Sequence, residues 1–156
     1  MKYTILCSLF LAMLFFSCGA GDVYKVDIRD SKNFDISRDK VWKTVLDMMA
    51  REIYVVKSIS EQRHMVQYDF EEIPADSIFK YTTTKGGKYI AAARSVFIEV
   101  KGDSIESTII INAVYEGIWQ GFDILGRLQN GMQKLYSNGK FESEFFAKLE
   151  NKLRKE

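Results

Sequence analysis

A long alternation of apolar and polar residues in the middle of the chain most constrains its fold. Residues 89–101 and 104–116 are rich in β-branched side chains, and Gly102 and Asp103 separate them. A glycine at the first position of a two-residue connection is typical of a type II′ turn. The pattern therefore predicts an antiparallel β-hairpin whose strands are both long.

The two-residue turn also predicts how the strands of this hairpin pair. Val100 lies opposite Ile105 in that register, and the face to which they belong is densely apolar. Glu99 then opposes Glu106 on the other face, which is unfavourable for like charges. Either that face is open to water or the turn has a different length.

Three shorter segments also have strand character. Residues 23–28 alternate with a period of two, and Phe34 and Ile36 continue the alternation after a polar break. Residues 54–59 are short and β-branched, and residues 66–70 alternate clearly. A polar turn that contains His64, which we expect to be exposed, joins these last two segments.

Two segments have the apolar spacing of amphipathic helices. Ser37 is placed to cap the first helix and Asn138 to cap the second. The predicted buried stripes are Trp42, Val45, Leu46, Met49 and Ile53 in the first, and Phe141, Phe145, Phe146, Leu149 and Leu153 in the second.

Residues 117–139 combine many glycines with many apolar side chains. Leu125, Leu128 and Met132 keep helical spacing, although glycine costs about 1 kcal/mol relative to alanine inside a helix. We expect a short, glycine-weakened helix here, and a functional loop is the alternative. Trp119 and Phe122 lie either at its surface or in the core.

These elements predict an α+β fold. We expect an antiparallel sheet of four to five strands packed on two helices, in the order β-α-β-β-β-β-α. Residues 23–156 are enough for one domain whose core is stable without disulfide bonds or bound metal ions.

The first 17 residues have the pattern of a secretory signal peptide. Lys2 gives a positive start, residues 5–16 are apolar except for Ser8, and small residues follow from Ser17. A helix needs roughly 20 apolar residues to cross a bilayer, so a cleaved leader is favoured over a permanent span.

The residues at the end of this leader resemble the lipobox of bacterial lipoproteins. Phe15, Phe16 and Ser17 precede Cys18, and the resemblance implies that Cys18 is lipidated and becomes the mature N-terminus, with residues 18–22 as a lipidated start and short tether. The alternative is an ordinary signal peptide cut after Ala20. Since Gly19 replaces the aspartate of inner-membrane retention signals, the resemblance implies an outer-membrane protein that faces the periplasm.

The element order and residues 34–42, which lead into the first helix, resemble the helix-grip domains of small bacterial lipoproteins. The lipoprotein C subunit of the outer-membrane β-barrel assembly machinery is an example of this group. The resemblance covers residues 23–155 and implies an accessory or scaffold role in the cell envelope, with no catalytic residue. Arg63, His64 and an insertion at residues 117–131 depart from the pattern.

The sequence contains no recognisable catalytic, metal or cofactor motif. His64 is the only histidine, and neither Cys7 nor Cys18 remains as a free thiol after processing and lipidation. Loss of the leader leaves 21 basic and 21 acidic residues, so the net charge does not favour nucleic acid. We therefore expect a protein that is not an enzyme and has no cofactor.

Three binding hypotheses follow. In the first, the protein presents a sheet edge or an apolar segment containing Trp119, Phe122, Ile124 and Leu125 to an envelope protein. In the second, the space between the last helix and the sheet holds a lipid or another apolar molecule, as some helix-grip domains do. The second requires a cavity of several hundred Å³.

The third hypothesis concerns the locally basic residues 80–94, which we expect to form an exposed hairpin tip at two glycines. Backbone amides at glycines can approach an anion closely. The candidate contacts to a phosphate or an anionic headgroup are Lys80, Lys85, Lys88 and Arg94.

Overall fold

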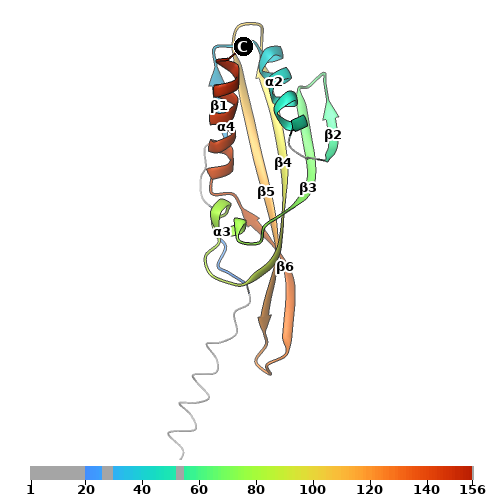
Figure 1. The fold of residues 1–156 in the computed structure, drawn as a ribbon, viewed down its shortest axis with the longest axis vertical. Helices are drawn as coiled ribbons and strands as arrows, with labels where there is room; N and C mark the ends of the chain where they lie inside the picture. The colour runs from blue at the N-terminus through green and yellow to red at the C-terminus, as the bar shows by residue number, and fades with distance from the viewer. Residues whose placement is uncertain (1–19, 26–29, 52–54, 156) are drawn as a thin grey trace, which may run out of the picture.

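The computed structural model describes residues 20–25, 30–51 and 55–155 (Figure 1). It confirms the predicted α+β class and the broad order of the elements, with a sheet of six strands and with a third, short helix. In chain order the elements are β1 (Ser31–Phe34), α2 (Arg38–Arg51), β2 (Val56–Ser60), β3 (Met65–Ile73), α3 (Ser77–Tyr81), β4 (Tyr89–Gly102), β5 (Ser107–Phe122), β6 (Leu128–Tyr136) and α4 (Lys140–Leu153).

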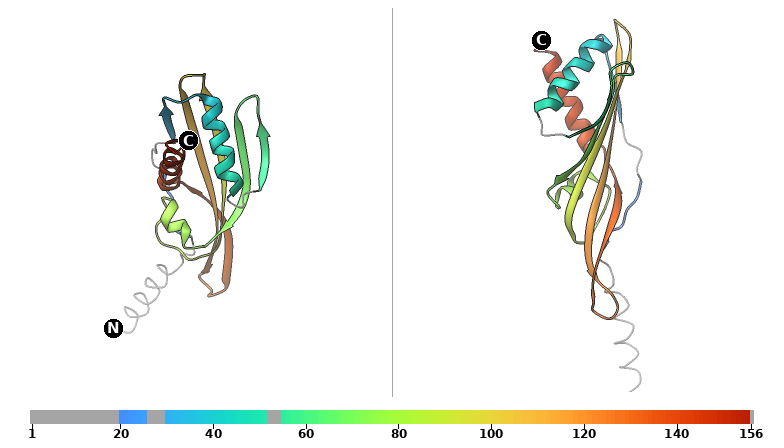
Figure 2. Two further views of the ribbon diagram at one scale, coloured as in Figure 1. Left: turned by 45° about the horizontal axis from the view of Figure 1, so that its top comes forward. Right: turned by 90° about the vertical axis from the view of Figure 1, so that its right-hand side faces the viewer.

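Strand β5 organises the sheet. It is 16 residues long, and this length lets one of its edges pair with β1 near its start and with β6 over its second half. The other edge pairs with β4, which leads through β3 to β2, and every pairing is antiparallel. Helices α2 and α4 lie on one face of this sheet (Figure 2).

The core lies between the two long helices and the sheet. Both predicted apolar stripes face it, although Leu46 is only partly buried and Ile53 lies outside the described residues. The fully buried residues of the strands come mainly from the central hairpin, as its periodicity predicts. Those of β4 and β5 are Val96, Ile98, Val100, Ile109, Ile111 and Tyr115.

The turn of the central hairpin is longer than predicted. Four residues, 103–106, connect the strands, so Val100 pairs with Ile109 rather than with Ile105. Because this shift is an even number of residues, the same side chains still face the core. The shift also removes the unfavourable glutamate pair, since Glu99 lies opposite Ile110.

The Asp103 side chain stabilises this longer turn. Its Oδ1 accepts hydrogen bonds from the backbone amides of Ile105 (2.8 Å) and Glu106 (3.1 Å). Its backbone carbonyl also accepts the Arg38 amide at the start of α2 (2.8 Å). A two-residue turn has no room for this arrangement, which explains why the sequence pattern gave the wrong length.

Replacement of Asp103 by alanine should reduce stability in a pH-dependent way. The amides of Ile105 and Glu106 hold the pKa of this carboxyl below its ordinary value of 3.8, so its stabilising effect is present above that value and is lost as the pH falls through the lower, folded-state pKa. Urea unfolding between pH 2 and pH 7 should show the largest difference between wild type and Asp103→Ala near neutral pH. A difference that does not change with pH would contradict this account.

The first strand was predicted in the wrong place. Val23 to Lys25 are not in a strand, and residues 26–29 lie outside the described residues. Strand β1 instead contains the polar residues that the alternation treats as a break. These residues pair with β5, where Ser31 lies opposite Ile110. Strand β1 lies at the edge of the sheet, and an edge strand tolerates polar side chains.

Residues 117–136 form strands and not the predicted helix. β5 continues to Phe122, a turn follows, and β6 returns along it, so the prediction of a glycine-weakened helix is wrong. Gly126 lies in the turn with φ of 74°, and Gly131 lies against the Trp119 ring. Both glycines therefore serve a hairpin, in which they cost less than inside a helix.

Residues 80–94 do not form an exposed hairpin tip. Their first residues complete α3, a loop follows, and the remainder begins β4. The loop is held to the rest of the fold near its start and at its middle, because the Thr83 amide donates to the Tyr136 carbonyl (3.0 Å) and Lys85 forms a β-bridge with Asp22.

Candidate interaction surfaces

The β5–β6 hairpin carries the largest group of exposed apolar side chains in the described residues. On the face away from the helices, Phe122 lies opposite Leu128 and Ile118 lies opposite Met132. One polar cross-strand pair, Gln120 with Asn130, separates these apolar pairs. Figure 1 shows that the hairpin extends beyond the rest of the sheet at the end where residues 20–25 lie.

The turn at the hairpin tip is ordered by Asp123. Its Oδ1 accepts the amides of Leu125 (2.8 Å) and Arg127 (2.9 Å), and its Oδ2 accepts Arg127 Nε at 2.8 Å. The Arg127 amide is the main reason that the pKa of the Asp123 carboxyl is lowered. Ile124 and Leu125 have 77% and 70% of their surface exposed, so a rigid turn presents two large apolar side chains.

Trp119 differs from the other three residues of the predicted contact segment. It pairs with Gly131 on the face that carries the helices, and a Cβ at residue 131 would lie 2.7 Å from the indole. The indole is partly buried against the core. The structure therefore brings Phe122, Ile124 and Leu125 together at the tip and places Trp119 three residues before Phe122, on the opposite face of the hairpin.

The four predicted anion contacts have separate partners. Lys80 is 3.5 Å from the Glu144 carboxylate, and Lys85 Nζ lies 5.5 Å from the Tyr24 ring centroid. Lys88 donates to Gln120 at 3.1 Å. Arg94 points into the protein, so the four side chains do not converge on one anion site.

Arg94 belongs to a mostly buried polar cluster that the sequence did not reveal. Its guanidinium forms an ion pair with Glu71 and stacks 4.2 Å from the Phe141 ring centroid, and both charged side chains are mostly buried. Burial raises the pKa of the Tyr115 hydroxyl nearby, with a smaller opposing effect from Arg94. The register of β3 shifts between Tyr68 and Glu71, and this irregularity places Glu71 opposite Arg94.

A second buried carboxylate fixes the start of α4. Glu142 is fully buried, accepts the Ser137 hydroxyl at 2.8 Å and accepts the Ala113 amide at 3.4 Å. These bonds join the helix to β5 and to the end of β6. Both buried acidic groups thus have structural partners within the fold.

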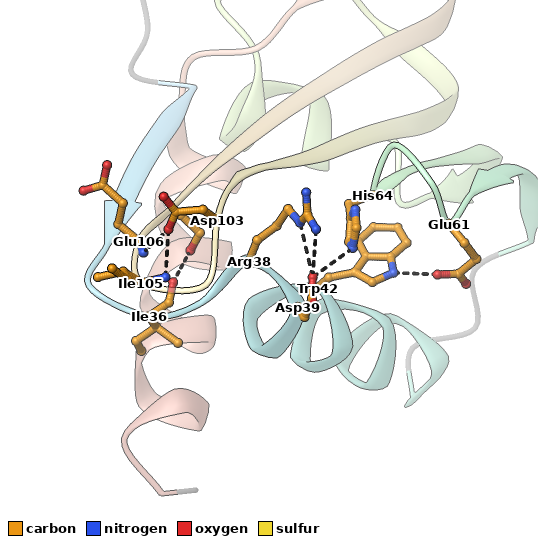
Figure 3. A network of polar contacts seen from close by, with 10 residues as sticks. Ile36, Arg38, Asp39, Trp42, Glu61, His64, Asp103, Ile105 and Glu106 are labelled. Carbon is orange, nitrogen blue, oxygen red and sulfur yellow. Dashed lines mark hydrogen bonds and ion pairs between the residues drawn. The ribbon is translucent and has the colours of Figure 1, made fainter.

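The only histidine lies in a polar network between α2 and the β2–β3 turn (Figure 3). Trp42 Nε1 donates to Glu61 at 2.8 Å, and the His64 ring meets the indole edge-on with centroids 5.6 Å apart. His64 Nε2 is 3.3 Å from Asp39 Oδ1. With 14% of its side chain exposed, His64 is not the exposed turn residue that we expected, because Trp42 covers it.

Strand β2 is a second exposed apolar surface. It forms one edge of the sheet and pairs with β3 alone in the part of the chain that the structure describes. Val56 and Ile59 in this strand are 51% and 49% exposed, and Val55, directly before it, is 67% exposed. Edge strands usually avoid such exposure because it invites pairing with another chain.

The space under α4 is occupied by side chains. Phe145, Phe146 and Leu149 are buried in the same cluster as Trp42. A hollow of about 290 Å³ lies elsewhere, where Lys25 and Asp30 approach β5 and β6.

The residues that the structure describes contain neither a metal-binding cluster nor a membrane-spanning helix. No cluster of three or more histidine, cysteine, aspartate or glutamate side chains is placed to hold a metal ion among them. Within the same residues, every helix is too short or too polar to span a bilayer.

Comparisons with models of protein families, with characterised proteins and with solved structures found no match to this chain.

Proposed function

We propose that this protein is a non-catalytic, lipid-anchored accessory protein of the cell envelope that binds a protein partner through strand β2. Cys18 supplies the anchor, the glycine after it favours the outer membrane, and the proposal places the domain on the periplasmic side. The observation that carries the proposal is the exposed apolar edge at Val55, Val56 and Ile59.

The register of β2 shows why this edge suits a partner. Val56 lies opposite Tyr68 and Ile59 opposite Val66, and both partners in β3 are core residues. The apolar face of the sheet thus continues onto β2, where half of each side chain remains exposed. A partner strand would add backbone hydrogen bonds along the edge and cover these side chains.

Lys57 lies between the two apolar residues and is 3.8 Å from Asp69 on β3. A lysine on an edge strand disfavours indiscriminate pairing between copies of a protein. The edge is therefore suited to a partner whose own side chains accommodate this charge.

The anchor leaves the edge accessible. Residues 20–25 lie near α3, towards the end of the molecule where the β5–β6 hairpin projects, whereas β2 lies towards the other end (Figure 1). A domain tethered through residue 18 can stand on the membrane with β2 directed away from it.

The absence of an enzymatic role is supported by the partners of the ionisable groups. Glu71, Glu142 and His64 are three mostly buried groups of the kind used in acid–base chemistry, and each contacts a residue that holds the fold together. Catalytic acids and bases need access to a substrate. The lipid-binding alternative is less well supported, because aromatic side chains fill the space under α4.

Substitution of Val56 and Ile59 by lysine should abolish capture of the partner. The tagged, full-length protein would be purified from its native membranes in mild detergent after chemical crosslinking, and bound proteins would be quantified by mass spectrometry. Both side chains are half exposed, so the fold should tolerate the change, and at least a tenfold loss of one specific protein is expected. Ile105→Lys is the matched control, since Ile105 is 76% exposed in the β4–β5 turn and does not belong to the β2 edge. Equal capture by both variants would exclude the edge, and the absence of any protein specific to the wild type would contradict the accessory role.

A further inference from the structure

We propose that the tip of the β5–β6 hairpin inserts into the bilayer that holds the lipid on Cys18. This inference rests on the lipidation in the proposed function, and it gives the anchored domain a fixed orientation. Three observations on the structure carry it: the position of the tether, the reach of the hairpin and the chemistry of its turn.

The tether joins the domain at the base of the hairpin. Gln133 Nε2 donates to the Gly21 carbonyl at 3.3 Å, and the Gly21 amide donates to the Tyr89 hydroxyl at 3.3 Å. The same hydroxyl donates to Gln133 Oε1 at 2.7 Å. Gly21 is thus fixed beside Gln133 of β6, and a Cβ on Gly21 would lie 2.4 Å from the Gly86 carbonyl oxygen.

The hairpin reaches further than the tether. From Gln133 to Leu128, β6 runs five positions towards the turn, which is about 17 Å at a rise of roughly 3.4 Å per residue. Gly21 follows Cys18 by three positions, and an extended chain spans at most about 10 Å over three positions. When the hairpin points at the membrane, its tip therefore passes the level of Cys18 by about 7 Å, a depth typical of interfacial apolar elements.

The turn has the side chains and the backbone hydrogen bonds of a segment that can be buried in a bilayer. Its apolar side chains are Phe122, Ile124, Leu125 and Leu128, all more than half exposed. Backbone groups are costly in hydrocarbon unless they are hydrogen-bonded. Here the Asp123 amide donates to the Arg127 carbonyl (3.0 Å) and the Gly126 amide donates to the Asp123 carbonyl (2.9 Å).

The charges at the tip also compensate each other. Asp123 forms an ion pair with Arg127, whose long side chain is mostly exposed and can extend towards lipid phosphates. One step back from the tip, Gln120 lies opposite Asn130, and Lys88 bonds to Gln120. The hairpin is therefore apolar at its end and polar where headgroups would surround it, which is the profile of a membrane-inserted loop.

A fluorophore at residue 125 tests this orientation. Once Cys7 leaves with the leader and Cys18 is acylated, the Leu125→Cys variant has one free thiol. This thiol would be labelled with bimane on the full mature protein, which would then be placed in phosphatidylethanolamine–phosphatidylglycerol vesicles. Nitroxides on the lipid acyl chains should quench this label at least threefold more than the same label on Ile105→Cys, at a distant turn. Addition of Ile124→Asn and Leu128→Asn to the Leu125→Cys variant should reduce the difference.

The outcomes separate the two proposals. The acyl chains of the labelled protein would first be verified by intact mass. If aqueous iodide then quenches the label at residue 125 as strongly as the label at residue 105, the insertion is overturned and the proposed function still stands. Shielding from both iodide and lipid nitroxides means that a protein surface covers the tip, and it also overturns the insertion. A mature protein without acyl chains overturns the insertion together with the proposed anchor.

Discussion

Substitution of Cys18 by serine is expected to move the protein from the membrane fraction to the soluble fraction. Two or three acyl chains anchor a protein stably, whereas a single chain holds it only marginally. Loss of all chains leaves the hairpin tip as the only membrane contact in our account. Its four apolar side chains, Phe122, Ile124, Leu125 and Leu128, would together contribute at most roughly 8 kcal/mol when buried, which is no more than one acyl chain supplies and therefore gives only marginal binding.

The experiment needs a leader that does not depend on the cysteine. A conventional secretory signal in place of residues 1–17 lets the Cys18→Ser chain be exported and cleaved. The control keeps the natural leader and carries Ser17→Ala, which preserves a small residue before the cysteine. Retention of the exported serine variant in carbonate-washed membranes would show that the anchor lies elsewhere.

Replacement of Arg94 by methionine is expected to lower the free energy of unfolding by about 3 kcal/mol. The substitution leaves the Glu71 carboxylate mostly buried without its cation, and loss of one partner of a buried pair is strongly destabilising. It also removes the cation from the Phe141 ring, which anchors the start of α4. Urea unfolding at neutral pH, followed by circular dichroism, measures the change.

The double variant Arg94→Met with Glu71→Gln is the matched control. Neutralising the carboxylate removes the uncompensated charge, so the double variant should recover more than half of the lost stability. If it is as unstable as Arg94→Met alone, the ion pair is not the source of the effect, and packing of the arginine stem against Phe141 would explain it.

The central hairpin and the two long helices were predictable because their periodicities are unambiguous. The apolar stripe of α4 is buried as the spacing requires, from Phe141 to Leu153. Even the wrong turn length kept the correct face of β5 in the core, since the shift was an even number of residues. Periodicity thus determines which face is buried more reliably than it determines the register.

The β5–β6 hairpin could not be recognised from apolar spacing alone. Leu128, Met132 and Tyr136 are four residues apart, and side chains at this spacing share a face both in a helix and in a strand. The better signal was the placement of Asp123 and Gly126, which form the turn. Once the hairpin is recognised, three of the four predicted contact residues fall at its tip.

The buried polar cluster had no signal in the sequence. Arg94 and Glu71 are 23 positions apart, and they meet because β3 is irregular after Tyr68. Such an irregularity depends on tertiary packing, which a pattern of single residues does not record. Arg94 therefore looked like one more exposed cation in a basic segment.

Intact mass spectrometry of the mature protein, extracted from its native membranes, tests the central claim most directly. We expect a polypeptide that starts at Cys18 and carries the added mass of two or three acyl chains on that residue. An unmodified chain that starts at Gly21, or a precursor that retains residues 1–17, would contradict the anchored account.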